Sequence, residues 1–110
     1  MLTRKSLNKL LDEVTEELIQ LDITPNKMIL FGSYATGSVH AYSDVDVALW
    51  SEKFTGKPLE DFDHVRPIVR KHHEISFKLY PAYATASEYD PFIEIIEQTG
   101  ICIYEQEKQT

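Results

Sequence analysis

The segment from Asp44 to Trp50 constrains the fold more than any other part of the chain, because its apolar residues fall at every second position. One side of an extended backbone would carry Val45, Val47 and Leu49, and the other side would carry Asp44, Asp46 and Ala48. This period of two is typical of a β-strand that packs one face against a core. We therefore predict a strand over residues 44–50, with its apolar face buried and its acidic face free.

The segments on either side of this strand alternate between helical and extended patterns. They predict helices over residues 3–21 and 59–71, a further helix from Pro91 to a cap at Gly100, and strands over residues 28–31, 74–80 and 101–104. Pro67 is expected to kink or divide the second helix. This order of elements predicts an α/β or α+β fold, in which helices cover a small mixed β-sheet.

The length of 110 residues allows one domain with one core. We predict a single domain over residues 1–105 and a polar tail over residues 106–110. With 43% apolar and 26% charged residues, the composition is globular and differs from that of a disordered chain. Cys102 is the only cysteine, so no internal disulfide is expected, and we predict it as a small buried side chain in the last strand.

The formal net charge of −7 bears on the partners of the chain. Proteins that capture nucleic acid need clustered Lys and Arg side chains for the phosphate backbone, so a nucleic-acid partner is not expected. A protein or a small molecule is favoured instead. The sequence has neither an apolar run of about 18 residues nor the apolar segment of a secretory signal, so we expect no membrane association and a cytoplasmic location.

A Gly-Ser pair stands before the acidic strand and is the second feature with chemical meaning. Gly32 and Ser33 directly follow the strand predicted at residues 28–31, and ten residues separate Ser33 from Asp44. Glycine lets a backbone come close to a phosphate, and the serine hydroxyl and neighbouring amides can donate hydrogen bonds to it, particularly if a short helix starts at Ser33. The pair therefore predicts an anion-binding turn.

Asp44 and Asp46 predict a metal site. Side chains at positions i and i+2 of a strand point to the same side, roughly 6.5 to 7 Å apart at the backbone. At that distance two carboxylates repel by roughly 2 kcal/mol, and a divalent cation would turn this repulsion into attraction. Oxygen ligands with open positions suit Mg²⁺ and the phosphates of a nucleoside triphosphate, so we expect nucleotidyl transfer with pyrophosphate as the leaving group. The alternative is structural: Ser33 and Ser43 would be caps, and the two aspartates would belong to a solvated strand face.

The stretch GSYATGSVHAYSDVDVAL resembles the signature of the DNA polymerase β-like nucleotidyltransferase superfamily, in its minimal nucleotidyltransferase branch. The leading helix and the closing DPFIEIIEQTGICIY resemble that branch too, so the resemblance covers most of the chain. It implies the polymerase β-like nucleotidyltransferase fold. It also implies that Gly32 and Ser33 bind the triphosphate, for which ATP is favoured, and that Asp44 and Asp46 are the catalytic pair that ligates Mg²⁺.

Two positions depart from the pattern of this superfamily. Thr36 stands where related sequences often have a basic residue, so one contact to a phosphate or to the acceptor is missing. The superfamily takes a third carboxylate from a later strand, and the segment here offers Glu74, Ser76 and Lys78 on one face. We favour Glu74 as the third catalytic and metal-binding residue. If Ser76 holds this position instead, activity would be weak or lost.

His72 and His73, which stand beside Glu74, also invite a metal-binding interpretation. Adjacent histidines at the end of a helix more often lie in solvent, so a zinc site is not favoured here. Both side chains are therefore predicted to be exposed.

The resemblance implies an enzyme that transfers a nucleoside monophosphate from a nucleoside triphosphate to a hydroxyl group of a protein or a small molecule. Members of the minimal branch are commonly the antitoxin of a pair with a HEPN-domain toxin, and some are thought to adenylylate that partner, so a HEPN-type protein partner is expected. The alternative is a catalytically weak or inactive module that neutralises a partner by binding, which Thr36 and the unassigned third carboxylate favour. An antibiotic or tRNA nucleotidyltransferase is less favoured, because such enzymes generally carry further domains and because the chain is acidic. A homo-oligomer and a hetero-complex both stay open.

Overall fold

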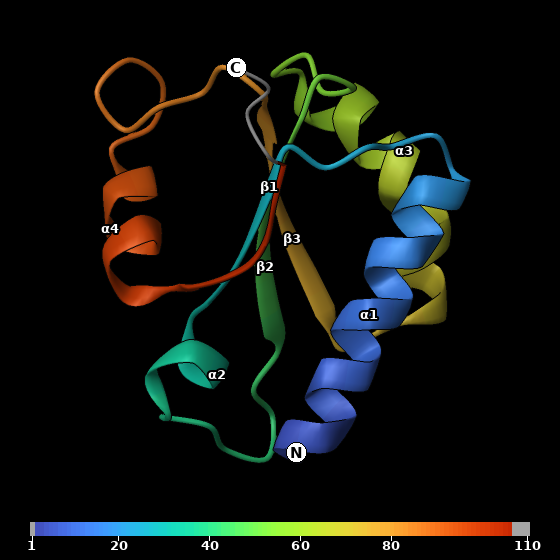
Figure 1. Ribbon diagram of the computed structural model, residues 1–110, viewed down its shortest axis with the longest axis vertical. Helices are drawn as coiled ribbons and strands as arrows, with labels where there is room; N and C mark the ends of the chain where they lie inside the picture. Colours follow the sequence, from blue (N-terminus) through green and yellow to red (C-terminus); the bar gives the residue numbers. More distant parts are fainter. Residues whose placement is uncertain (1, 107–110) are drawn as a thin grey trace.

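The predicted order of helices and strands is present in the computed structural model, which describes residues 2–106 (Figure 1). Within these residues the helices are α1 (Arg4–Gln20), α2 (Ser33–Thr36), α3 (Pro58–Lys71) and α4 (Phe92–Thr99). The strands are β1 (Lys27–Phe31), β2 (Val45–Ser51), β3 (Ile75–Pro81) and β4 (Ile101–Glu105). None of the described helices is both long and apolar enough to span a membrane. Residue 1 and residues 107–110, most of the predicted polar tail, lie outside the described residues.

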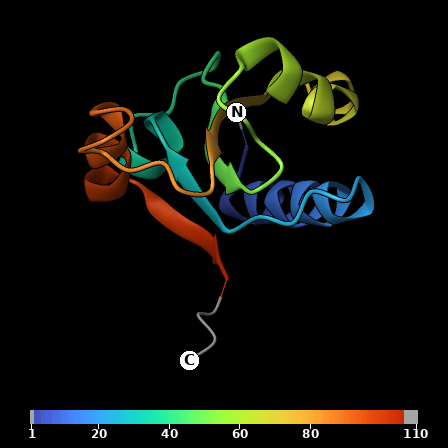
Figure 2. The same ribbon diagram turned by 90° about the horizontal axis from the view of Figure 1, so that it is seen from above.

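The strands form one mixed sheet in the order β3-β2-β1-β4. β1 runs antiparallel to both β2 and β4, whereas β2 and β3 are parallel. The register pairs Asp46 of β2 with Phe31 of β1 on one side and with Ser76 of β3 on the other. Helices α1 and α3 lie on one side of the sheet and α4 lies on the other (Figure 2). The predicted α+β fold with a small mixed sheet is therefore confirmed.

Helix α1 packs against the sheet with the apolar stripe that its helical spacing predicts. A capping box begins the helix, because Ser6 N–H donates to Thr3 Oγ1 at 3.1 Å and Thr3 N–H donates to Ser6 Oγ at 2.8 Å. Each fully buried aliphatic side chain contributes roughly 1.5 to 3 kcal/mol. The core on this side contains Leu7, Leu10, Leu11, Val14 and Leu18 of α1, Val65 and Ile68 of α3, and Met28, Leu30, Val45, Val47, Leu49 and Ile75 of the sheet.

The second face of the sheet is not free, which corrects the prediction made from the period of two. A second core lies under α4 and consists of Ile29, Ala48, Trp50, Tyr80, Ala84, Ile93 and Ile96. The ring of Trp50 stacks on Tyr80 at a centroid distance of 5.0 Å, and its Nε1–H donates to the carbonyl oxygen of Ala84 at 3.1 Å. This second core does not cover the start of β2, where Asp46 is half-buried and Asp44 is exposed.

Helix α3 and the starts of β2 and β3 differ from the sequence prediction in ways that bear on the site. Helix α3 runs through Pro67 and is not divided there. Pro67 removes the donor for the carbonyl group of Asp63, but both residues are exposed, so water can satisfy that carbonyl group. Asp44 and Glu74 lie one residue before β2 and β3 respectively. Both carboxylates are therefore carried by the segments that lead into the strands.

β4 is more exposed than the buried strand that the sequence predicts. Cys102 is exposed, and Ile101 is 49% exposed. β4 forms one edge of the sheet and pairs with β1 alone, so part of its surface has no covering layer. Local hydrophobicity could not reveal this position, because it follows from the order of the strands.

Candidate active site

The turn after β1 depends on glycine. Gly32 has φ 73° and ψ −154°, a backbone conformation that is essentially restricted to glycine. Helix α2 starts at the next residue, Ser33, which meets the condition stated for an anion-binding turn, and the N–H groups of Ala35 and Thr36 donate to the carbonyl oxygen of Gly32 at 3.0 and 3.1 Å. The first N–H groups of a helix have no partner within it, so this turn can offer donors to an anion.

The carboxylate of Asp46 lies directly against this turn. A Cβ atom added to Gly32 would meet Asp46 Oδ2 at 2.3 Å, so the absence of a side chain at Gly32 allows the approach. The register of β1 and β2 produces the contact, because Phe31, the residue before Gly32, pairs with Asp46. The structure thus brings together Gly32 and Asp46, which are fourteen positions apart in the sequence.

The two aspartates leave an unbalanced negative charge at this place. Burial, and then the charge of Asp44, raises the pKa of the Asp46 carboxyl above its ordinary value of 3.8. The ionised form of Asp46 is therefore disfavoured by its surroundings. A divalent cation would reverse this, since it attracts both carboxylates. Oxygen donors in this electrostatic setting fit Mg²⁺.

The loop between the Gly-Ser turn and β2 is tied back on itself. His40 N–H donates to Ser43 Oγ at 2.9 Å, and Ser43 N–H donates to the carbonyl oxygen of His40 at 3.0 Å. One residue after Asp44, Val45 N–H donates to the carbonyl oxygen of Glu74 at 2.7 Å. Asp44 is therefore placed between a closed turn and a backbone hydrogen bond, although it lies outside the strand.

Two residues at the start of β3 and just before it are the candidates for the position of a third carboxylate. Ser76 lies opposite Asp46 in the parallel pairing of β2 and β3 and is exposed. Glu74 is half-buried in the turn before β3, level with Asp44 if the register is continued by one step. A hydroxyl group, not a carboxylate, thus faces the position beside Asp46, and Glu74 stays a prediction.

The start of α4 borders the same face of the sheet, a neighbour that no local pattern in the sequence predicted. Lys78 follows Ser76 at the next position on this face, and its Nζ lies 3.6 Å from Asp90 Oδ2 and 5.4 Å from the centre of the Phe92 ring. The Phe92 ring in turn meets Phe31 edge to face, with centroids 6.0 Å apart. The sequence signals were present, because the period of two puts Lys78 beside Ser76 and Pro91 marks a helix start. What they could not give was the packing of α4 against β1.

Asp90 fixes this border. Its carboxylate accepts hydrogen bonds from Phe92 N–H at 3.0 Å and from the Tyr80 hydroxyl at 2.9 Å. The backbone hydrogen bond from Phe92 is the largest influence on the pKa of Asp90; together with Tyr80 and Lys78 it outweighs the effect of burial and lowers that pKa. Asp90 is therefore a satisfied acid, unlike Asp46.

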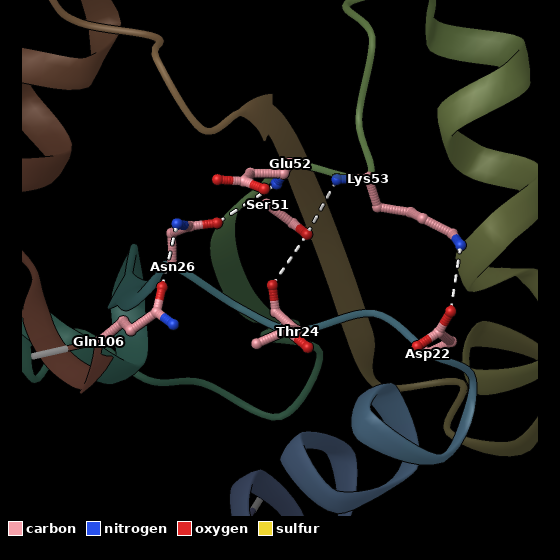
Figure 3. Close-up of a pocket in the computed structure, with 7 residues that line it drawn as sticks. All are labelled: Asp22, Thr24, Asn26, Ser51, Glu52, Lys53 and Gln106. Carbon is pink, nitrogen blue, oxygen red and sulfur yellow. Dashed lines mark hydrogen bonds and ion pairs between the residues drawn. The ribbon is translucent and has the colours of Figure 1, made fainter.

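A polar pocket of about 350 Å³ lies at the other end of β2 and is not part of this site (Figure 3). The residues that line this pocket mainly form hydrogen bonds with one another. Ser51 Oγ donates to the carbonyl oxygen of Thr24 at 2.9 Å, and Glu52 N–H donates to Asn26 Oδ1 at 3.2 Å. Ser51 stands five residues beyond Asp46, which corresponds to roughly 17 Å along a strand. The pocket is therefore formed by the connecting segments at the far end of the sheet, away from Asp46.

Comparison with known proteins relates this geometry to other chains. The family model described as the nucleotidyltransferase domain matches residues 7–107. Among solved structures, the chain is similar to a toxin–antitoxin with AMP-PNP, at 15% identity and a TM-score of 0.60, over 91% of this chain and 74% of that one. It is also similar to a mutant of the toxin–antitoxin MntA-HpeT with two aspartate-to-glutamate substitutions, at 15% identity and a TM-score of 0.54, over 96% of this chain and 76% of that one. A search of curated proteins gave no match.

The two solved structures share the fold of this chain, and the family model carries the assignment. The matched residues include the Gly32 turn, both aspartates before and within β2, and the parallel strand β3. The resemblance found in the sequence and the arrangement of the sheet agree with this match. The chain belongs to the nucleotidyltransferase domain family.

Proposed function

We propose that the chain transfers a nucleoside monophosphate from a nucleoside triphosphate, ATP being favoured, to a hydroxyl group. The observation that supports this most directly is the contact of Asp46 Oδ2 with the backbone of Gly32. An acid that lies against a phosphate-binding turn brings a metal-bound triphosphate and its acceptor to one place. Phosphoryl and nucleotidyl transfer mainly require a protein to position the reactants and to stabilise the charge of the transition state.

Each residue has a defined part in this proposal. Asp44 and Asp46 hold Mg²⁺, and the backbone of Gly32 and Ser33 with the Ser33 hydroxyl orients the phosphates. When bound, Mg²⁺ supplies positive charge to the phosphate oxygens. The acceptor oxygen forms a bond to the α-phosphorus, the bond from this phosphorus to the bridging oxygen breaks, and its electron pair leaves with pyrophosphate. The proton of the acceptor hydroxyl goes to a base, for which Glu74 is the predicted residue.

A protein acceptor is proposed on the basis of the similar structures. Both are toxin–antitoxins, one contains AMP-PNP, and the other carries substitutions at two aspartates. We infer that this chain acts as the antitoxin beside a HEPN-type toxin, in a hetero-complex, and modifies a hydroxyl group of that partner. The predicted cytoplasmic location stays a prediction.

One observation favours a second function, a module that neutralises its partner by binding. Ser76 occupies the position opposite Asp46, where a carboxylate would complete three acids around one metal site. Thr36 removes a basic residue at the same time. If Glu74 does not reach the site, two carboxylates alone would hold the metal and transfer would be slow.

Incubation with labelled ATP, Mg²⁺ and the protein encoded beside this one separates the two functions. Labelling of the partner that disappears in Asp44→Asn supports the transferase, provided that the variant still forms the complex. A tight complex without labelling, unchanged by Asp44→Asn, would support the binding module and exclude the transferase for that partner.

A further inference from the structure

A second group of metal-binding side chains lies on the opposite face of the sheet from Asp46. Glu13 and Glu17 are one turn apart on α1, and His72 directly follows α3. One ligand atom from each of the three lies within 4.8 Å of the others. Ligand atoms around a tetrahedral zinc ion, at 2.0 to 2.1 Å from it, are about 3.4 Å apart. Small side-chain rotations would therefore suffice to place all three around one ion.

His72 is held in place for such a role. Its side chain is buried, contrary to the prediction that both adjacent histidines are exposed, whereas His73 is exposed. The N–H group of His72 donates to the carbonyl oxygen of Ile68 at 2.9 Å, and His72 caps the C-terminus of α3. Its Nε2 lies 3.0 and 3.2 Å from the two carboxylate oxygens of Glu17. The imidazole and one carboxylate are thus already oriented toward each other.

We propose that Glu13, Glu17 and His72 form a binding site for a zinc-type divalent cation. One imidazole nitrogen with two carboxylates is a donor set of the kind that Zn²⁺ accepts with water as a fourth ligand, whereas Mg²⁺ prefers oxygen ligands alone. The site differs from the Asp44 and Asp46 site in this respect. Two metals of different chemistry would therefore bind to opposite faces of the sheet.

Lys71 acts as the competitor of the ion. Its Nζ lies 3.0 Å from Glu17 Oε1 and neutralises the carboxylate when no metal is bound. The Lys71 side chain is 66% exposed, so it can turn into solvent when an ion takes its place. The ion must replace this ion pair, and removal of the Lys71 charge should tighten metal binding. If the three residues formed only an ion-pair cluster that binds no metal, removal of the Lys71 charge would have no effect on zinc binding.

An ion bound at this site would link helix α1 to the turn before β3. Glu13 and Glu17 belong to α1, while His72 begins the short turn into β3, the strand that carries Ser76 opposite Asp46. The ion would add a third ligand contact, from Glu13, to a junction where Glu17 already contacts Lys71 and His72. We assign it a structural role at the start of β3.

Zinc titration of the purified chain by calorimetry, in the presence of excess Mg²⁺, tests the site. We expect one Zn²⁺ per chain and a higher thermal midpoint, because a ligand that binds only the native state stabilises it. Glu13→Gln changes an exposed side chain and should weaken binding at least about tenfold, while His72→Gln should abolish it. Lys71→Met should tighten binding.

Three matched variants guard against other zinc ligands. His73→Gln removes the exposed neighbour of His72, Cys102→Ser removes the exposed thiol, and Asp44→Asn alters the other metal site; each should leave the affinity unchanged. If His72→Gln does not fold, Glu13→Gln and Lys71→Met decide the question. The proposal is overturned if wild-type chain shows no binding, or if Glu13→Gln binds Zn²⁺ as tightly as wild type.

Discussion

Two acidic clusters stand at the same end of the sheet, on opposite faces, and differ in how their charge is balanced. On one face, burial and then the charge of Asp44 raise the pKa of Asp46, and no cation within residues 2–106 offsets this effect. On the other face, burial would raise the pKa of Glu17, but hydrogen bonds and charges from His72 and Lys71 outweigh it and lower that pKa. Lys71 and His72 thus offset the negative charge of Glu17, whereas the charge of Asp44 adds to that of Asp46.

If the proposed function holds, this difference separates a reactive site from a site that only stabilises the fold. Groups whose charged form is disfavoured by their surroundings concentrate where a substrate or metal completes the structure. Groups whose charge is balanced within the chain can hold elements together even before an ion binds. Substitutions should accordingly change activity on the Asp46 face and stability on the Glu17 face.

Asp46→Asn should give the largest effect. Loss of a metal ligand removes several kcal/mol of transition-state stabilisation, so we expect transfer to fall at least about hundredfold. The thermal midpoint should not fall, because the ionised form of Asp46 is disfavoured in the native state. Labelled-nucleotide transfer and a thermal melt of the same preparation measure both quantities. Unchanged transfer would remove Asp46 from the site.

Gly32→Ala should damage both the turn and the acid that lies against it. The backbone at φ 73° and ψ −154° costs a non-glycine residue about 1 to 3 kcal/mol, and the new Cβ would meet Asp46 Oδ2 at 2.3 Å. We expect roughly tenfold lower transfer and a lower free energy of unfolding. Gly37→Ala is the control, because Gly37 also has a positive φ, of 85°, but has no atom within 4 Å of the added Cβ. Equal losses of activity in the two variants would show that the contact with Asp46 does not matter.

Ser76→Asp tests which residue holds the third position. If the place opposite Asp46 needs a carboxylate, this change should raise transfer about tenfold at saturating Mg²⁺, and Glu74→Gln should have little effect. If Glu74 is the base or ligand, Glu74→Gln should lower transfer at least about tenfold, and Ser76→Asp should not help. Steady-state rates of both variants distinguish the outcomes.

The sequence predicted most of the elements because their patterns are local. The stripe of α1 and the alternation of β2 need only neighbouring residues, and Gly32 marked its own turn. The sequence could not show that Trp50 is covered by α4, because that depends on helix packing across the sheet. It also left Glu74 and Ser76 undecided, since their register against Asp46 is a property of two strands about 30 residues apart.

A long-range contact also explains why the prediction that His72 is exposed was wrong. Its partner Glu17 is 55 positions away, and no local pattern connects them. The acidic face of α1 suggested solvent, and the end of α3 suggested the same for the histidines. Only the packing of α1 beside α3 brings the two surfaces together in one partly buried contact.

Glu17→Gln should give the smallest effect, and one that depends on pH. The pKa of Glu17 in the native state lies below its ordinary value of 4.5, so its ionised form stabilises the fold above about that pH. This contribution is lost as the pH falls through the native pKa. Because the groups are partly solvated, the difference between wild type and variant should be no more than about 1 kcal/mol at neutral pH.

Urea unfolding with a chelator present, between neutral and acidic pH, measures this difference without interference from bound metal. Glu16→Gln is the matched control on the exposed side of the same helix and should show no such dependence. A Glu17→Gln deficit that persists undiminished in acid would mean that packing, and not charge, is what Glu17 contributes. In that case the contrast with Asp46 would no longer be one of balanced against unbalanced charge.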